Sequence, residues 1–349
     1  MTEYSLNKLA YRFGQPTETA AIRQQPEHFK VQELIRVEPD GTGEHLWLNI
    51  RKRGMNTQFL MKQVARWAGV SERNVSHAGL KDRHAVTEQW LSVQLPGKPD
   101  PDIRELENDD IQVIAAHRHS QKLRSAVLLA NRFELLLTNV SDPQAVVERW
   151  QQVSRGVPNY FGEQRFGHSF GNIDKAKQVF AGKRVKRHLQ SLFLSAARSW
   201  LFNCMISQRL EQGQFETLIA GDMLMLAGSR SHFQNQGEAD LPERLASGDV
   251  QLSAPLWGEG YEKLEGEYLA LAQSVANSEP ELAEGLVKQR VKMALRPILL
   301  KPEHGRIDLV GKDVKISFVL PSGSFATSVL RELVSYQDAS GSVHADLGE

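Results

Sequence analysis

Hydrophobic and polar residues alternate along several segments of the first third of the chain and again near its end. Leu46, Leu48 and Ile50 are separated by single residues. The same spacing recurs in segments 29–37, 91–95, 133–137 and 314–320. A period of two predicts strands that bury one face. These segments are therefore expected to form a sheet.

The segment 29–37 is the first of these predicted strands. Phe29, Val31, Ile35 and Val37 would share one face, which Glu33 interrupts. The turn-forming sequence EPDGTGEH separates this segment from 46–50. Aspartate and glycine between two alternating segments favour a turn. The two strands are therefore predicted to pair as a hairpin.

The middle of the chain has a helical period instead. From about residue 174 to residue 300, apolar residues recur every three or four positions, as in the stripe of Phe193, Ala196, Ala197, Trp200 and Cys204. The order of strands, helices and strands predicts an α+β protein. Its mixed or antiparallel sheet domain would be discontinuous, formed by residues 1–156 and 305–349. A second, largely helical α/β domain of residues 157–304 would be inserted into it.

Composition narrows the class of protein. The chain has 42 Lys and Arg residues and 42 Asp and Glu residues, so its net charge neither indicates nor excludes nucleic-acid binding. The single cysteine cannot form an internal disulfide or a zinc site of several sulfurs. No apolar run of about eighteen residues is present. We expect a cytoplasmic protein with no membrane span.

Local runs of cations stand out against the neutral total. They are RKR at 51–53, HRHSQKLR at 117–124 and KRVKRH at 183–188. Such runs are either solvated surface or contacts for phosphate groups. His117 and His119 lack a cysteine or carboxylate at ligand spacing, so no metal site is expected.

The stretch HAGLKDRHAVTEQW, at 77–90, concentrates chemically active residues just before a predicted strand. Asp82 lies between Lys81 and Arg83. A nearby cation keeps a carboxylate ionised, and an ionised carboxylate can act as a nucleophile or a base. The alternative is an aspartate in a surface loop with solvated neighbours.

Five stretches in order carry a resemblance to a known family. They are PEHFKVQEL at 26–34, GLKDRHAVTEQW at 79–90, ANRFELLL at 130–137, GVPNYFGEQRFG at 156–167 and LPSGSFATSVLREL at 320–333. They resemble the signatures of the D family of transfer-RNA pseudouridine synthases, TruD. The resemblance implies an isomerase that converts a uridine of tRNA, at position 13, to pseudouridine. It implies one catalytic aspartate, which is Asp82 here, and no metal or organic cofactor.

The resemblance also assigns roles around Asp82. Arg23 matches a basic residue, lysine in other members, that would pair with the carboxylate, and Lys81 is the rival for this role. Phe133 would be the ring on which an extruded uracil stacks, although its place in an alternating strand equally fits the core. Asn131 would touch the base or ribose, or cap a turn.

The glycine- and aromatic-rich segment 156–167 would contact RNA through Asn159, Arg165 and Phe166, unless it is only a tightly packed loop between domains. The inserted domain would help to hold tRNA, and the protein is expected to be a monomer. Two rival functions remain. One is a non-catalytic RNA-binding protein, and the other is a hydrolase that releases the base with Glu88 as a second carboxylate.

Overall fold

The computed structural model describes residues 4–340, and the chain divides into two compact units. The ends of the predicted sheet domain, residues 1–3 and 341–349, lie outside the described residues. The sheet unit comprises Pro16–Ser154, Pro302–Ala326 and Leu333–Glu349. The helical unit comprises Met1–Gln15, Arg155–Lys301 and Thr327–Glu332.

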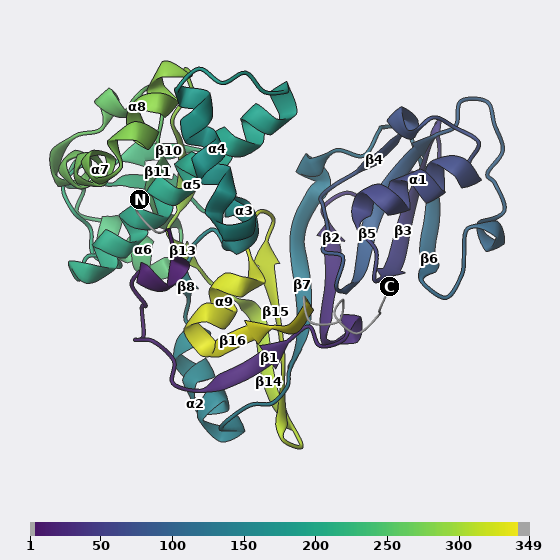
Figure 1. Ribbon diagram of the computed structural model, residues 1–349, viewed down its shortest axis with the longest axis horizontal. Helices are drawn as coiled ribbons and strands as arrows, with labels where there is room; N and C mark the ends of the chain where they lie inside the picture. The colour runs from purple at the N-terminus through teal and green to yellow at the C-terminus, as the bar shows by residue number, and fades with distance from the viewer. Residues whose placement is uncertain (1–3, 341–349) are drawn as a thin grey trace. The chain divides into compact units, whose positions relative to one another are not determined.

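The sheet unit is built on one mixed sheet (Figure 1). Its strands, in spatial order, are β14 (Glu303–Val310), β15 (Asp313–Pro321), β7 (Leu128–Leu137), β2 (Phe29–Ile35), β5 (Val86–Gln94), β3 (His45–Arg53) and β6 (Ile111–His119), with β4 (Val75–His77) also paired to β5. Only β2 and β5 run parallel; the other neighbours in this sheet are antiparallel. The predicted α+β class with a mixed sheet is confirmed.

The predicted hairpin between the first two strands is wrong. β5 lies between β2 and β3 and pairs with both. Segment 36–44, which joins β2 to β3, exceeds the roughly two to five residues of a tight hairpin loop, so it does not force its flanking strands to pair. β2 ends at Ile35, and Val37 beyond it is exposed.

A helix covers one face of the sheet. α1 (Thr57–Trp67) begins at Asn56, whose side chain accepts a hydrogen bond from the Phe59 amide. Leu60 and Val64, four positions apart, are fully buried in a cluster with the alternating residues of β3. The second helix of the unit, α2 (Pro143–Val153), packs against β14 and β15.

A short parallel ribbon brings the two ends of the sheet unit together. β1 (Thr19–Ile22) pairs with β16 (Ser335–Asp338), and Ile22 lies opposite Asp338. Arg23, which follows β1 directly, is thereby placed next to a residue 315 positions away in the chain.

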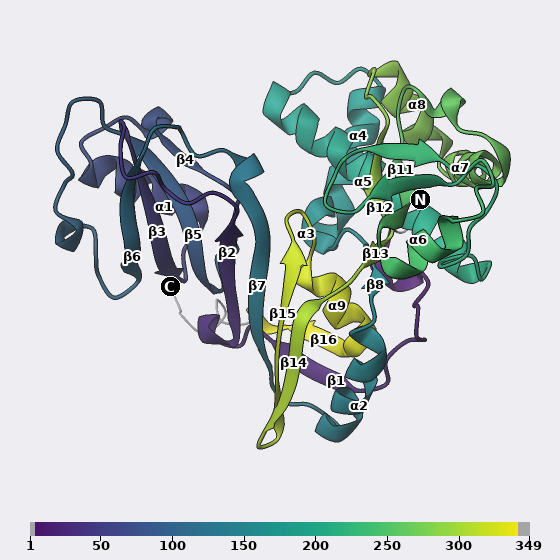
Figure 2. The ribbon, with the colours of Figure 1, turned by 180° about the vertical axis from the view of Figure 1, so that it is seen from behind.

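The helical unit is formed around the long helix α5 (Arg187–Glu211), which packs against α4 (Gly171–Phe180), α7 (Gly266–Ser278), α8 (Pro280–Lys288) and the strand β11 (Val250–Leu256) (Figure 2). The predicted stripe of α5 is buried from Phe193 to Trp200. The other helices and strands of the helical unit are α3 (Glu163–Phe166), α6 (Leu241–Ser247), β8 (Val157–Pro158), β9 (Met223–Leu226), β10 (His232–Gln234), β12 (Ala294–Pro297), β13 (Leu299–Leu300) and most of α9 (Ala326–Leu333). Within residues 4–340, no helix has the length and hydrophobicity needed to cross a membrane.

Candidate active site

The segment from Ala78 to Ala85 is a loop between β4 and β5 that is anchored at several points. The backbone amide of Lys81 donates to Oγ1 of Thr57, at the first turn of α1, over 2.9 Å. The Gly54 amide donates to the carbonyl of Ala85 over 3.3 Å. The loop that carries Asp82 is therefore held by both the end of β3 and the start of α1.

The most buried of these anchors is Lys52. Its side chain has no exposed surface, although it is an ammonium. Nζ donates to the carbonyl of Asp82 over 2.9 Å and to the carbonyl of Met55, just before α1. Burial lowers the pKa of Lys52 to about 8, against a smaller opposing effect of the Asp82 charge. One buried cation thus ties together β3, α1 and the backbone of Asp82.

The structure brings Arg23 and Asp82 together. Nη2 of Arg23 lies 3.0 Å from Oδ2 of Asp82, and Nη1 lies 2.7 Å from Oδ2 of Asp338. Arg23 is 7% exposed, whereas the Asp82 side chain is 32% exposed. Burial alone would raise the pKa of Asp338, but the charge of Arg23 and hydrogen bonds from Ser340 outweigh it and lower that pKa. One guanidinium therefore bridges two carboxylates.

The conformation of Arg23 is itself unusual. Its φ of 58° lies in the left-handed region that non-glycine residues rarely adopt. Such a conformation persists when the surrounding contacts over-determine it, and it is common at functional sites. The guanidinium carbon of Arg23 also lies 3.9 Å from the centroid of the Phe29 ring. Two acids and one ring thus fix this side chain.

Phe133 is placed within an aromatic row rather than on an open surface. Its ring centroid lies 6.3 Å from that of Phe29 and 5.5 Å from that of Phe318, and it is 7% exposed. Asn131, two residues earlier on β7, is also buried, and its Oδ1 has no hydrogen-bond partner among the described residues. Phe133 contacts the ring that supports Arg23.

Lys81 is directed to another acid. It forms a buried ion pair with Glu33, whose other oxygen accepts from the Trp90 amide over 2.7 Å. This pair explains why a glutamate interrupts the apolar face of β2. Lys81 therefore anchors the loop to β2, whereas Arg23 contacts the carboxylate of Asp82.

The predicted residues of the glycine-rich segment all lie in the helical unit. Phe166 is fully buried and packs edge-on against Trp200. Asn159 is buried and accepts from Arg296 over 2.6 Å. Arg165 is half-buried, and its guanidinium lies over the ring of Phe161. The segment, which includes β8 and α3, is thus tightly packed and contacts arginine side chains.

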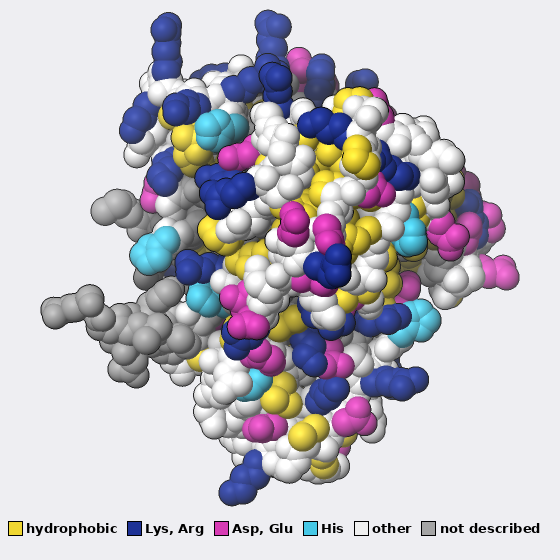
Figure 3. Space-filling model, turned by 90° about the vertical axis from the view of Figure 1, so that its right-hand side faces the viewer, with side chains coloured by type: hydrophobic (Ala, Val, Ile, Leu, Met, Phe, Trp, Pro, Cys, Tyr) yellow, Lys and Arg dark blue, Asp and Glu magenta, His cyan; other side chains and the backbone are white. Residues whose placement is uncertain are grey.

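Two of the three cationic runs are neutralised in part within the sheet unit. In the first, Arg51 pairs with Glu88 and Arg53 with Glu27, while Lys52 is buried. In Figure 3, Asp and Glu lie among the Lys and Arg side chains in the middle and lower parts of the face, whereas Lys and Arg predominate along its upper edge. A run of cations in the sequence therefore need not form a cationic surface.

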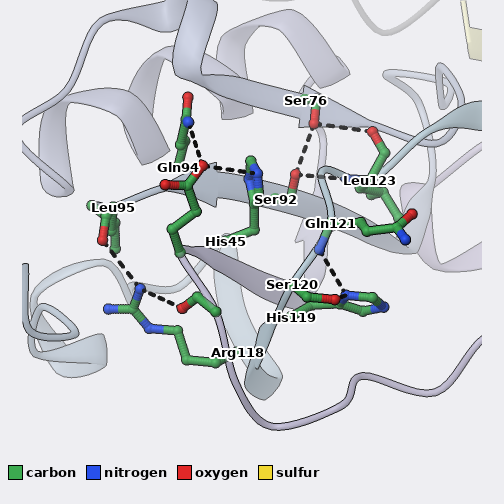
Figure 4. Close-up of polar contacts among 12 residues, drawn as sticks. His45, Ser76, Ser92, Gln94, Leu95, Arg118, His119, Ser120, Gln121 and Leu123 are labelled. Carbon is green, nitrogen blue, oxygen red and sulfur yellow. Dashed lines mark hydrogen bonds and ion pairs between the residues drawn. The ribbon is translucent and has the colours of Figure 1, made fainter. Parts of the chain in front are cut away.

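The run at 117–124 supplies structural contacts. Arg118 pairs with Asp100 and donates to the carbonyls of Leu95 and Lys98, and His119 stacks on the Trp47 ring. Figure 4 shows Arg118 directed at Leu95, and Nδ1 of His119 accepting from the Gln121 amide. Only the end of this run, with the exposed Lys122 and Arg124, remains as cationic surface.

The third run, KRVKRH at 183–188, differs from the others. Its four Lys and Arg residues are all exposed, and none forms an ion pair with a described residue. The run lies at the end of the connection between α4 and α5 and continues into the first turn of α5. It is a cationic surface of the helical unit.

The geometry gives less support to the hydrolase alternative. Glu88, the second carboxylate of the hydrolase alternative, is held by Arg51 over 2.6 Å and by Gln32 over 2.9 Å. Across residues 4–340, no three His, Cys, Asp or Glu side chains are grouped so that they could hold a metal ion.

Three residues of the site were not found from the sequence. Asp338 and Phe29 contact Arg23, and Lys52 contacts the backbone of Asp82. The alternation of Leu46, Leu48 and Ile50, continued by two positions, would have put Lys52 on the buried face. No pattern in the sequence links Asp338 to Arg23.

Comparisons with known proteins agree over nearly the whole chain. The family model described as tRNA pseudouridine synthase D (TruD) matches residues 5–179 and 174–333. The tRNA pseudouridine synthase D of Aeromonas hydrophila is 46% identical over 337 residues, which cover 96% of each protein. That of Colwellia psychrerythraea is 42% identical over 342 residues, covering 94% of this chain and 93% of the relative.

A solved structure also matches. A crystal structure of a protein from Methanosarcina mazei, described as tRNA pseudouridine synthase D, superposes with a TM-score of 0.74. It covers 93% of this chain and 95% of the other, at 22% sequence identity. At this identity the match establishes the fold.

Proposed function

The chain belongs to the tRNA pseudouridine synthase D family and is a tRNA pseudouridine synthase, and we propose that the carboxylate of Asp82 carries out its reaction. The observation that carries this proposal is the contact between Asp82 and Arg23 in an anchored loop. An acid that is fixed by its backbone, held by a cation and still one-third exposed has the properties that a catalytic carboxylate needs.

The proposed reaction rearranges one nucleoside without oxidation or reduction. The N1–C1′ glycosidic bond of uridine breaks, the uracil turns, and C5 forms a bond to C1′. The Asp82 carboxylate can begin this in two ways, by attacking C1′ or by removing the 2′ proton. Each way uses a carboxylate oxygen of Asp82, and the guanidinium of Arg23 holds this carboxylate in position. No metal or organic cofactor takes part in this proposal.

The target base must leave the stack to expose C1′. We assign Phe133 as the ring that supports the extruded uracil and Asn131 as a hydrogen-bonding partner of the nucleotide. The unpartnered Oδ1 of Asn131 supports this role, since a buried polar atom usually has a partner. For Lys81, the ion pair with Glu33 favours a role in holding the loop rather than in direct contact with substrate.

The finer parts of the proposal rest on the family and on charge. The target is uridine 13 of tRNA, and the enzyme acts as a cytoplasmic monomer. The sheet unit carries the catalytic residues. The helical unit contributes RNA contacts through the exposed cations of 183–188 and through Arg165 in the glycine-rich segment 156–167. Asn159 and Phe166 hold that segment in place.

The decisive experiment maps pseudouridine in tRNA treated with the protein. Wild type should form pseudouridine at one position, and Asp82→Asn should form none while still binding tRNA. Asp109→Asn is the matched control, because it makes the same chemical change at an exposed aspartate. Near-normal turnover by Asp82→Asn would remove Asp82 from the mechanism, and abasic tRNA as product would favour a hydrolase.

A further inference from the structure

Two arginines of the helical unit lie against the same aromatic ring. The guanidinium carbon of Arg296, on β12, is 4.3 Å from the centroid of Phe161, and that of Arg165, on α3, is 5.3 Å from it. Both side chains are half-buried. Arg296 was not singled out by any sequence pattern, since it lies outside the glycine-rich segment.

Neither of these arginines pairs with an acid among the described residues. Arg296 donates one side-chain hydrogen bond, to Asn159, and Arg165 donates one, to Oγ of Ser195 over 3.3 Å. The Nε atoms of both are buried and have no partner within residues 4–340. Since each guanidinium has five N–H donors, most of this capacity is not used within the chain.

Arg209 of the same unit shows how the fold satisfies a buried arginine that has only a structural role. It forms an ion pair with the buried Asp222 and donates to the carbonyls of Gln214 and Thr217. A buried cation without such partners is unfavourable. The side chains of Arg165 and Arg296 have no acid partner among the described residues, and neither donates to a backbone carbonyl there.

The electrostatics of the pair are unfavourable in the absence of an anion. Burial lowers the pKa of Arg296 to about 10, and the nearby charge of Arg165 adds to this effect. Burial also lowers the pKa of Arg165. Each guanidinium would therefore be stabilised by a negative charge placed between or beside them.

The groups around the pair are fixed in place. Asn203 holds Phe161 through both its backbone amide and its carbonyl, over 2.9 and 3.0 Å. Asn159 donates from its side chain to the carbonyl of Pro297 over 2.9 Å. The ring and the amide that orient the guanidinium of Arg296 are thus preorganised, as in a binding site.

We propose that Arg165 and Arg296 together form a binding site for one phosphate of the tRNA backbone. Guanidinium groups present paired N–H donors that match phosphate oxygens, and they retain their charge when they are partly buried. That the phosphate belongs to tRNA rests on the proposed function. Inorganic phosphate shares the chemistry of the ligand and serves as a probe that does not depend on catalysis.

The first test measures tRNA binding at a series of salt concentrations. Arg296→Gln should weaken binding roughly tenfold or more, which corresponds to the loss of hydrogen bonds to a charged group. The slope of log K against log salt should decrease by about 0.7–1, as expected for one lost phosphate contact. Arg230→Gln, which removes the same charge from an exposed loop, should change both quantities much less.

The second test separates binding from folding. Removing one of two like charges should leave the melting temperature of the free protein unchanged or raised. Inorganic phosphate, compared with chloride at equal ionic strength, should stabilise wild type more than Arg296→Gln. Arg165→Gln should behave in the same way, and Arg296→Lys should keep most of the salt slope.

A structural role would give the opposite results. If Arg296→Gln and Arg165→Gln both lower the melting temperature and keep wild-type affinity and salt slope, the site does not exist. If wild type makes no pseudouridine but phosphate stabilises it through these arginines, the proposed function fails and the anion site stands. If wild type makes pseudouridine and neither variant affects binding, the proposed function stands and the anion site does not exist.

Discussion

The buried ammonium of Lys52 leads to a prediction whose sign depends on pH. Lys52→Met keeps most of the hydrocarbon volume of the side chain but removes the donor to the carbonyls of Asp82 and Met55. The change therefore acts on the anchoring of the Asp82 loop while leaving the adjacent hydrophobic core filled.

The magnitude follows from the pKa of Lys52, which falls from 10.5 to about 8 on burial. Between these values the unfolded chain binds a proton that the folded chain does not, so the free energy of unfolding rises with pH. At about 1.4 kcal/mol for each pH unit, this gain is about 3 kcal/mol. Below pH 8 both states are protonated, and the full penalty of the buried charge is present.

The assay is denaturant unfolding of wild type and Lys52→Met at several values between pH 7 and pH 10.5. The difference between them should shift by about 3 kcal/mol in favour of wild type across this range. Lys62→Met, which removes an exposed ammonium from α1, should follow wild type. A constant difference between wild type and Lys52→Met would refute the reasoning.

The same variant should separate stability from catalysis at neutral pH. Loss of the charge penalty offsets the two lost hydrogen bonds, so global stability should change little. The Asp82 backbone loses its anchor, however, and a displaced catalytic group can reduce the rate by about 100-fold. We expect kcat to fall with little change in tRNA affinity. An unchanged kcat would exclude the anchoring role.

Three further changes test other parts of the site. Asp338→Asn should lower kcat roughly tenfold, because Arg23 loses one charged acceptor, while tRNA affinity is kept; equal losses in both would contradict this. Phe133→Leu should slow pseudouridine formation while thermal unfolding shows a loss of about 1 kcal/mol; lost stability with normal turnover would make Phe133 only a core residue. Replacing Lys186 and Arg187 by glutamate should weaken tRNA binding in low salt; unchanged affinity would make the run plain surface.

The strands β2, β7 and β15 were predictable because each of them buries one face, which the period of two indicates directly. β14, whose residues are almost all exposed, has no such pattern and was not predicted. The order of the strands in the sheet was not predictable in the same way. The parallel pairing of β2 with β5 depends on the path of the chain through β3 and α1, and no local pattern records that path. The hairpin prediction failed because adjacency in sequence was taken as adjacency in space.

The centre of the candidate site was accessible from motifs, whereas its supports were only partly so. Asp82 stands in a stretch that resembles a family signature, and Arg23 lies three positions before another, which begins at Pro26. The structure places the two side chains 3.0 Å apart. Glu33 was visible as an anomaly in an apolar face, and Lys52 would have been visible as another. Asp338 is brought to Arg23 only by the pairing of β1 with β16, which the sequence does not indicate.

The cationic runs show why counting charges in the sequence gives a poor estimate of the cationic surface. A strand directs alternate residues to opposite faces, so RKR in β3 directs Arg51 and Arg53 outward to acids of other strands and Lys52 into the interior. Lys183, Arg184 and Lys186 lie in a loop, which has no such constraint, and Arg187 begins α5; all four reach solvent. Whether a Lys or Arg adds to the cationic surface therefore depends on the element that carries it and on the acidic side chains near that element. By this criterion an RNA phosphate can bind at the run at 183–188, at the Arg165–Arg296 pair and at the exposed Lys122 and Arg124, none of which pairs with an acid among the described residues.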